Sequence, residues 1–456
     1  MKSEKLPKND RKEIFGWIMY DWANSVFFTT VVGVLIGEYI TSLAQKAVGE
    51  NGVVLSLGSL EVTAKSLFPY AVGLSVFLQI FFLPVMGAIA DYTQLKKTFM
   101  AVFCGLGVLG CCLLFFVEGN LYLLGSVLFI VSNLSAGASI VFYNSFLNDI
   151  TTEDKRDKVS SWGFAAGYGS GVLMLILNLI FLNNCESWGI SIGMAVRISL
   201  LTAGVWWGLF ALITFSTLKT RMPERTAPEG KNLVVAGIGE LIETFRELFQ
   251  LKHTLRFLIA YLLYNDGIQT VITSSAIFIS QELFVAKGLT TNNTTLIIAF
   301  LIAQIVAFFG ALVFERISNY TNSKTAIMIS LVIWSVIVIY AYGFLETLTQ
   351  AYIMSGAIGF VLGGSQALSR SLFSQMIPAG RESAFFGIYE ISERGTSWIG
   401  PIVFGLVAQM TNSYRPAILA LIVFFIVGSI ILFFTNTAQA IHEAGNLTPQ
   451  EAAKGS

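Results

Sequence analysis

The chain of 456 residues is 55% hydrophobic and 12% charged, with 28 basic and 28 acidic side chains. A soluble domain carries about 25% charged residues, so the composition predicts an integral membrane protein. The balanced charge excludes nucleic acid as a partner, because nucleic-acid binding needs a basic surface. The two histidines and four cysteines show no metal-ligand spacing, and we expect neither a metal nor a cofactor.

Predominantly apolar runs of about 20 residues or more are long enough to cross a bilayer as helices. The expected spans lie at 14–45, 67–91, 97–117, 120–147, 159–183, 192–217, 254–284, 294–315, 324–345, 347–376, 382–411 and 413–435. They predict an all-α integral membrane protein with twelve transmembrane helices in two six-helix repeats. The predicted organisation begins with a cytoplasmic N-terminal segment (1–13) and a six-helix bundle (14–217). A cytoplasmic linker (218–252), a second six-helix bundle (253–435) and a cytoplasmic tail (436–456) follow.

The basic residues of the short loops indicate the orientation. Lys and Arg gather in the loops on the side of the N-terminus, as at Lys155 and Lys158, whereas the other side carries few. The positive-inside rule therefore predicts that both termini are cytoplasmic. We expect a monomer surrounded by the lipid bilayer of the plasma (inner) membrane.

The first predicted span carries a polar patch. Asp21 and Ser25 share a helix face, and Asn24 lies beside them. A charge near the bilayer centre costs at least about 2.5–3.5 kcal/mol on insertion scales, so an acid inside a span is expected to have a structural or functional role. Asp21 either lines a substrate cavity, which we favour, or holds helices together. Trp17, near the end of the span, is interpreted as an interfacial anchor.

The fifth predicted span contains a row of small residues. Gly163, Gly167 and Gly171 recur every four residues, so they share one face of a helix. This spacing lets helix backbones approach closely, and we expect tight helix packing there.

The linker holds the only long connection between spans. Apolar side chains between residues 238 and 249 follow helical spacing, with glutamates opposite. This pattern predicts an amphipathic helix on the cytoplasmic surface. We interpret this segment as a tether between the two bundles, and a regulatory or partner-binding role is the alternative.

The seventh predicted span repeats the chemistry of the first. The segment that begins at Asp21 aligns with the one that begins at Asp266 at a constant offset of 245, pairing acids, amides and hydroxyls. Such internal similarity is typical of transporters built from repeats. We expect Asp266 and Gln269 to face the same cavity as Asp21, and a purely structural role for Asp266 is the alternative.

The tenth and eleventh predicted spans also carry charges. Gln366 and Arg370 lie in the tenth span, where Arg370 either lines the cavity or snorkels to the nearer surface. Glu390 and Arg394 are four residues apart with the acid first, which favours a salt bridge on one helix. Glu393 points elsewhere, so it is the strongest candidate for a group that binds and releases protons.

The connection between the second and third spans contains a candidate gating motif. Its members are Gly87, Asp91, Lys96 and Lys97. Together with six plus six spans in repeated halves, this motif resembles the major facilitator superfamily. The match is partial, because Tyr92 and Gln94 replace the superfamily's usual Arg and Gly.

Two longer motifs carry a narrower resemblance. They are Tyr20-Asp21-Trp22-Ala23-Asn24-Ser25 and the stretch Gly364 to Ser371, which continues through Ile377-Pro378, Gly380-Arg381-Glu382 and Phe385-Phe386-Gly387 to Tyr389. They resemble the unknown major facilitator family, which is grouped with the fungal vacuolar effluxers that export amino acids during autophagy. The chain departs from it at Ser392-Glu393-Arg394, where Ser-Gly-Lys is expected.

The intramembrane charges and the resemblance together predict a secondary transporter, not an enzyme. The expected substrate is a small polar metabolite, with an amino acid moved outward by alternating access as the leading hypothesis. Protons are the candidate coupling ion, carried by an acid such as Glu393 or Asp266. The alternatives are a sugar or nucleoside facilitator, and a non-transporting receptor or scaffold of the same fold.

Overall fold

The computed structural model describes residues 6–49, 52–57, 60–222, 233–284, 293–391, 393 and 399–455. The helices are α1 (Arg11–Val26), the π-helix η1 (Phe27–Leu35), α2 (Ile36–Val48), α3 (Leu67–Asp91), α4 (Lys96–Leu113), η2 (Leu114–Phe116), α5 (Tyr122–Ile150), η3 (Glu153–Lys155), α6 (Arg156–Asn184), η4 (Glu186–Trp188), α7 (Ile192–Thr217), α8 (Leu233–Gln250), α9 (Lys252–Leu283), α10 (Asn293–Tyr320), α11 (Ser323–Phe344), α12 (Leu348–Gln375), α13 (Glu382–Glu390), α14 (Ile399–Thr411), α15 (Tyr414–Ala420), α16 (Ile422–Phe433), α17 (Thr437–Glu443) and α18 (Pro449–Gly455).

One short hairpin departs from the all-α prediction. Strands β1 (Val53–Leu57) and β2 (Leu60–Thr63) pair antiparallel after α2. Both strands are rich in Val, Leu and Thr, and β-branched residues favour strands.

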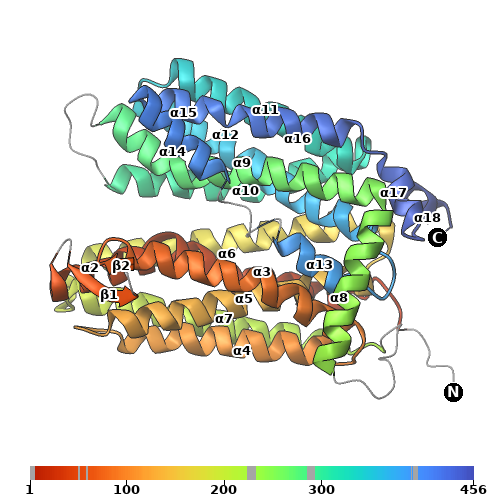
Figure 1. Cartoon of the computed structure of the whole chain (residues 1–456), viewed down its shortest axis with the longest axis horizontal. Helices are drawn as coiled ribbons and strands as arrows, with labels where there is room; N and C mark the ends of the chain where they lie inside the picture. The colour runs from red at the N-terminus through yellow and green to blue at the C-terminus, as the bar shows by residue number, and fades with distance from the viewer. Residues whose placement is uncertain are drawn as a thin grey trace.

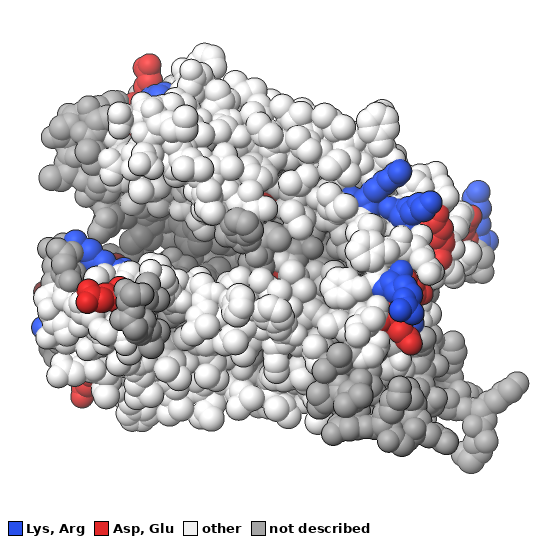
Figure 2. Space-filling view, in the orientation of Figure 1, with Lys and Arg blue, Asp and Glu red and all other residues white. Residues whose placement is uncertain are grey.

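Long apolar helices dominate the described residues, and ten of them are long and apolar enough to cross a membrane. The predicted span at 254–284 corresponds to α9, a helix of 32 residues that carries several polar side chains. The predicted span at 382–411 contains two shorter helices, α13 and α14. The total of twelve crossings therefore stays a prediction. On the face shown in Figure 2, the charged side chains gather at the two ends and leave an uncharged band between them.

The helices form two groups that lie side by side (Figure 1). Helices α1–α7 make the N-terminal group and α9–α16 the C-terminal group. Each group has its own hydrophobic core, because one cluster of buried side chains comes from residues 17–218 and the other mainly from residues 248–441. Helices α8, α17 and α18 lie at one end, here called the terminal side, and the hairpin lies at the opposite side.

The two groups are joined at the terminal side. The carbonyl oxygen of Ser374 on α12 accepts hydrogen bonds from Asn148 at 2.9 Å and from Arg156 at 3.1 Å, both in the N-terminal group. The hydroxyl of Ser371 donates to Asp157 of α6 at 2.5 Å. At the opposite side the surface is hollowed between the groups (Figure 2). The structure is therefore closed at the terminal side and open at the opposite side.

The linker contributes the amphipathic helix α8, which crosses the terminal side (Figure 1). A salt bridge of 2.7 Å joins its Glu247 to Arg381, the residue before α13. Ile242, Phe245 and Phe249 are exposed on another face of α8. The helix thus combines a polar attachment to the C-terminal group with an apolar surface.

Candidate functional site

Two opposite charges from different helical groups meet inside the protein. Asp21 lies on α1 and Arg370 on α12, and both terminal nitrogens of Arg370 lie 3.3 Å from Asp21 Oδ2. The hydroxyl of Tyr143 on α5 donates to the same oxygen at 2.6 Å. Arg370 is 3% exposed and Asp21 8% exposed. Because an unpaired buried charge is costly, each residue stabilises the other, and the pair ties the two groups together.

The other donors of Arg370 also bond to the N-terminal group. Its Nε donates to Ser160 Oγ at 2.9 Å, and its Nη2 donates to the Ser160 carbonyl at 2.8 Å. Its Nη1 donates to Asn144 Oδ1 at 3.3 Å. A planar guanidinium presents donors in a fixed fork, so these acceptors hold it in one orientation.

Three aromatic rings surround the same guanidinium. Its central carbon lies 4.9 Å from the ring centroid of Trp17, 5.6 Å from that of Tyr143 and 4.2 Å from that of Phe164. Such distances give attractive cation–π contacts. We name the residues around Arg370 the guanidinium cage; it consists of Trp17, Asp21, Tyr143, Asn144, Ser160 and Phe164.

The glycine row of α6 makes room for the polar face of α1. A Cβ atom on Gly163 would lie 2.4 Å from Asp21 Oδ2, and one on Gly167 would lie 2.4 Å from Ser25 Oγ. The predicted close helix packing is thereby confirmed. Ser25 packs against α6, one turn from the guanidinium cage.

Two further predicted residues lie at the same interface between the groups. The hydroxyl of Tyr168 on α6 donates to Gln366 Oε1 at 2.6 Å, one turn from Arg370 on α12. Asn144 of the cage donates through Nδ2 to Glu390 Oε1 at 2.9 Å. Asn144 therefore contacts Arg370 with its carbonyl and Glu390 with its amide nitrogen.

The acidic segment after α13 is described only in part. Glu393 is half-buried, and its backbone carbonyl accepts a hydrogen bond from Asn265 at 3.1 Å. Arg394 lies outside the described residues, and with it the predicted salt bridge to Glu390.

Asp266 has a different environment from Asp21. It is fully buried in the C-terminal group, where its Oδ2 accepts a hydrogen bond of 2.7 Å from the backbone N–H of Gly400 in the first turn of α14. A carboxylate at a helix N-terminus is stabilised by the unpaired N–H groups there. Gln269 is half-buried one turn along α9. Asn24 is 3% exposed, and its Nδ2 makes no hydrogen bond to the described residues.

The candidate gating motif joins the groups through its first two members. Asp91 at the end of α3 accepts hydrogen bonds from the backbone N–H groups of Ser383 at 2.9 Å and Ala384 at 2.8 Å, in the first turn of α13. A Cβ on Gly87 would lie 2.2 Å from the Ser383 carbonyl, so only glycine allows this approach. The other two members, Lys96 and Lys97, form hydrogen bonds within the N-terminal group.

Replacing Asp91 with alanine is expected to open the terminal side more often. Loss of a helix-capping acceptor costs about 1 kcal/mol, which shifts a two-state equilibrium about fivefold. Maleimide labelling of Ser374→Cys, in a background without the native cysteines, measures this opening. Glu315→Ala is the matched control, because Glu315 bonds to Asn319 within its own helix. Equal labelling rates in both variants would contradict a gating role for Asp91.

Two sequence-based interpretations need correction. Trp17 is not an interfacial anchor, because it is fully buried and its Nε1 donates to the Tyr143 carbonyl at 2.8 Å. Arg370 does not snorkel, because Asp21 holds it in the interior.

The sequence analysis also missed the uncharged members of the cage. Tyr143, Asn144 and Ser160 carry no formal charge, so the insertion cost of a buried charge did not mark them in the sequence. Asparagines such as Asn144 and Asn148 in a long apolar span were the available signal.

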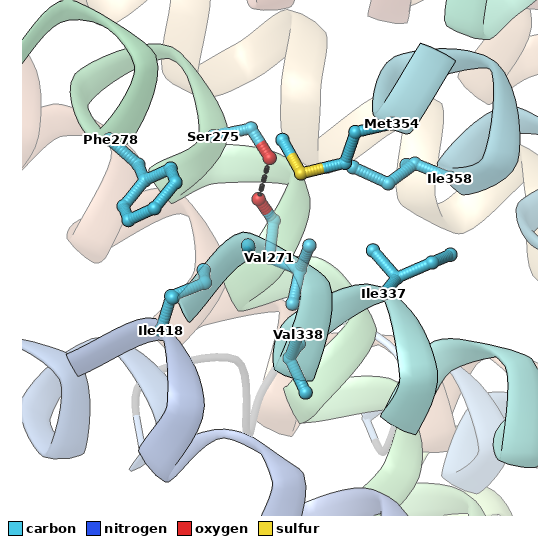
Figure 3. Close-up of a pocket in the computed structure, with 9 residues that line it drawn as sticks. Val271, Ser275, Phe278, Ile337, Val338, Met354, Ile358 and Ile418 are labelled. Atoms are coloured by element: carbon cyan, nitrogen blue, oxygen red, sulfur yellow. Dashed lines mark hydrogen bonds between the residues drawn. The ribbon is translucent and has the colours of Figure 1, made fainter. Parts of the chain in front are cut away.

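A small cavity inside the C-terminal group lies apart from these residues (Figure 3). Its volume is about 10 Å³, room for about one water molecule. Most of its lining is apolar, and the hydroxyl of Ser275 is already bonded to the Val271 carbonyl at 2.5 Å. Its size and lining exclude it as a site for a polar metabolite.

Known sequences resemble this chain over almost its whole length. The family described as "Vacuole effluxer Atg22 like" matches residues 9–445. The uncharacterized MFS-type transporter YxiO of Bacillus subtilis (strain 168) is 30% identical over 431 residues, which cover 94% of this chain and 96% of that protein. Autophagy-related protein 22 of Coccidioides immitis (strain RS) is 26% identical, over 91% of this chain and 85% of that protein.

Solved structures share the fold at low sequence identity. The human organic anion transporter MFSD10 superposes with a TM-score of 0.69 at 13% identity, covering 93% of this chain and 100% of that one. The proton:xylose symporter XylE superposes with a TM-score of 0.68 at 12% identity, covering 97% of this chain and 98% of that one. The fold is therefore that of the major facilitator superfamily.

These comparisons correct the predicted location. The family description and the fungal relatives indicate vacuolar effluxers, so the predicted plasma-membrane location is wrong, whereas a multi-pass membrane protein is supported. The relatives are transporters and not enzymes. With a family match over residues 9–445 and a major facilitator fold, the chain belongs to the Atg22-like vacuole effluxer family of MFS-type transporters.

Proposed function

We propose that this protein is a secondary transporter that exports an amino acid by alternating access. Two six-helix groups joined by the 218–252 linker would form the moving units, with α9 and the α13–α14 pair completing twelve spans. The description of the family as vacuole effluxers supports the direction. The ion pair that the two groups share supports both the mechanism and the substrate.

The Asp21–Arg370 pair is the observation on which the substrate proposal rests. Its partners come from different groups, so the pair breaks when the groups part at the terminal side. An amino acid carries an ammonium and a carboxylate, which bind Asp21 and Arg370 respectively. The zwitterion thus replaces one buried ion pair with two and leaves no charge unpaired. A sugar or nucleoside, which would bind through amides such as Gln366, Gln269 and Asn24, does not supply these charges.

Flux in proteoliposomes tests this proposal. The purified protein should take up labelled leucine, and unlabelled leucine should compete. Two analogues of leucine are the matched controls: the amine that lacks the carboxylate, and the acid that lacks the ammonium. Both should compete poorly. Equal competition by sugars or nucleosides would overturn the amino-acid proposal. Failure to move any metabolite of a broad panel would favour a receptor or scaffold.

Coupling to a proton gradient is the second part of the proposal, with Glu393 and Asp266 as the candidate carriers. Asp266→Asn keeps an oxygen that accepts from the Gly400 N–H, and Glu393→Gln keeps the side-chain shape. A variant of a true carrier acid should still exchange substrate but lose accumulation driven by a pH gradient. Counterflow and pH-driven uptake measure the two properties separately. Parallel loss of both, or no response of the unmutated protein to a pH gradient, would contradict proton coupling.

A further inference from the structure

The guanidinium cage is built entirely from the N-terminal group, whereas the guanidinium it holds comes from the C-terminal group. Four oxygen atoms of Asp21, Asn144 and Ser160 accept five hydrogen bonds from Arg370. Three rings contact the same planar group. The cage supplies one carboxylate and no basic side chain. The N-terminal group therefore presents a complete receptor for a guanidinium.

Alternating access requires this receptor to be vacated. Arg370 moves with α12 when the terminal side opens, and Asp21 then keeps a carboxylate among the rings of Trp17 and Phe164. A buried carboxylate needs a cation or a proton. A proton would neutralise Asp21 alone, and it would leave Asn144 Oδ1 and the ring faces without the partner they have in this structure.

We propose that the guanidinium cage is a ligand-binding site for guanidinium-bearing substrates of the arginine class. Arg370 fills it while the terminal side is closed, and the guanidinium of the ligand fills it when the two groups part. The inference rests on the proposed function for two steps, the parting of the groups that vacates the cage and the passage of the bound ligand across the membrane. Binding itself requires no transport.

The chemistry of the cage distinguishes arginine from lysine. A guanidinium presents a planar fork of donors and stacks against aromatic faces, whereas an ammonium is a compact and strongly hydrated charge. Arginine and its decarboxylated analogue agmatine should therefore bind about tenfold more tightly than the corresponding ammonium compounds, a typical gain from a desolvated cation–π contact.

Chemical rescue provides a direct test on the full-length protein. Arg370→Ala vacates the cage, and millimolar ethylguanidinium should then raise the melting temperature of the purified variant. Ethylammonium is the matched ligand and should act only at about tenfold higher concentration. The double variant Arg370→Ala/Asp21→Asn is the matched protein control, because it removes the carboxylate of the cage and should lose the response. An equal response to both cations in both variants would overturn the proposal.

Competition on the unmutated protein decides the question if Arg370→Ala does not fold. Arginine should inhibit uptake of labelled leucine about tenfold more strongly than lysine does, and Phe164→Leu should remove most of that difference. Arginine that competes no better than lysine, in a protein that still carries leucine, overturns the cage proposal and leaves the proposed function standing. Guanidinium binding without flux of any amino acid supports the cage and refutes the proposed function.

Discussion

Arg370→Ala is expected to destabilise the protein by about 3–5 kcal/mol and to abolish transport. The substitution leaves the carboxylate of Asp21 buried without its cation, and the hydroxyl of Tyr143 alone does not neutralise it. It also removes the hydrogen bonds that tie α12 to Ser160 and Asn144. Thermal unfolding of the detergent-purified protein and flux in proteoliposomes measure the two losses.

A charge-neutral double variant separates stability from function at this pair. Asp21→Asn/Arg370→Gln removes both charges, so most of the lost stability should return, because no buried charge is left unpaired. Transport should stay absent, since neither charge of a zwitterion then has a partner. A single variant Arg370→Ala as stable as the unmutated protein would show that the pair contributes little. Recovery of flux in the double variant would contradict the proposed substrate recognition.

Gly163→Ala should also abolish most transport, although it changes no charge. The new Cβ would lie 2.4 Å from Asp21 Oδ2, 3.0 Å from Arg370 Nη2 and 3.0 Å from the Trp17 ring. Hydrogen bonds and ring contacts hold these atoms in place, so the methyl group must displace the ion pair. Overpacking of this kind costs about 1–3 kcal/mol. If the same free energy is lost from transport, flux should fall about fivefold or more, since about 1.4 kcal/mol corresponds to a factor of ten.

Gly169→Ala is the matched control on the same helix. Its Cβ would meet Phe308 and Trp22 at 3.6 Å, which is ordinary van der Waals contact. Alanine is also the better helix former, so this variant should keep its stability and its transport. Initial uptake rates of the two variants, normalised to the amount of folded protein, measure the difference. Full activity of Gly163→Ala would show that the site tolerates a shifted Asp21.

Much of the membrane architecture follows from local properties of the sequence. The cost of placing a polar side chain in hydrocarbon depends on the residue and its depth, so apolar runs predict most of the helices. The same cost singled out Asp21 as a buried acid that requires compensation. For Arg370 the sequence left two alternatives, the cavity and the nearer membrane surface. Helical spacing likewise predicted the amphipathic character of α8 and the small-residue face of α6.

The partners of those charges were not predictable in this way. Asp21 and Arg370 are 349 residues apart, and the sequence instead suggested a local pair of Glu390 with Arg394. Asp266 aligned with Asp21, yet in the structure it caps α14 while Asp21 binds Arg370. Positions that align in the sequence acquire different partners because the opposing helix surfaces differ.

The sequence by itself therefore determined that this is a membrane protein of mainly helical spans with a few buried charges that require compensation. Only the tertiary structure decided which charges compensate one another, that uncharged Tyr143, Asn144 and Ser160 complete the cage, and that the terminal side is closed. The physical reason is that insertion cost is a property of each helix alone. Pairing depends on how helices distant in the chain pack, and the side that is open depends on a small free-energy difference between two packings of the same groups.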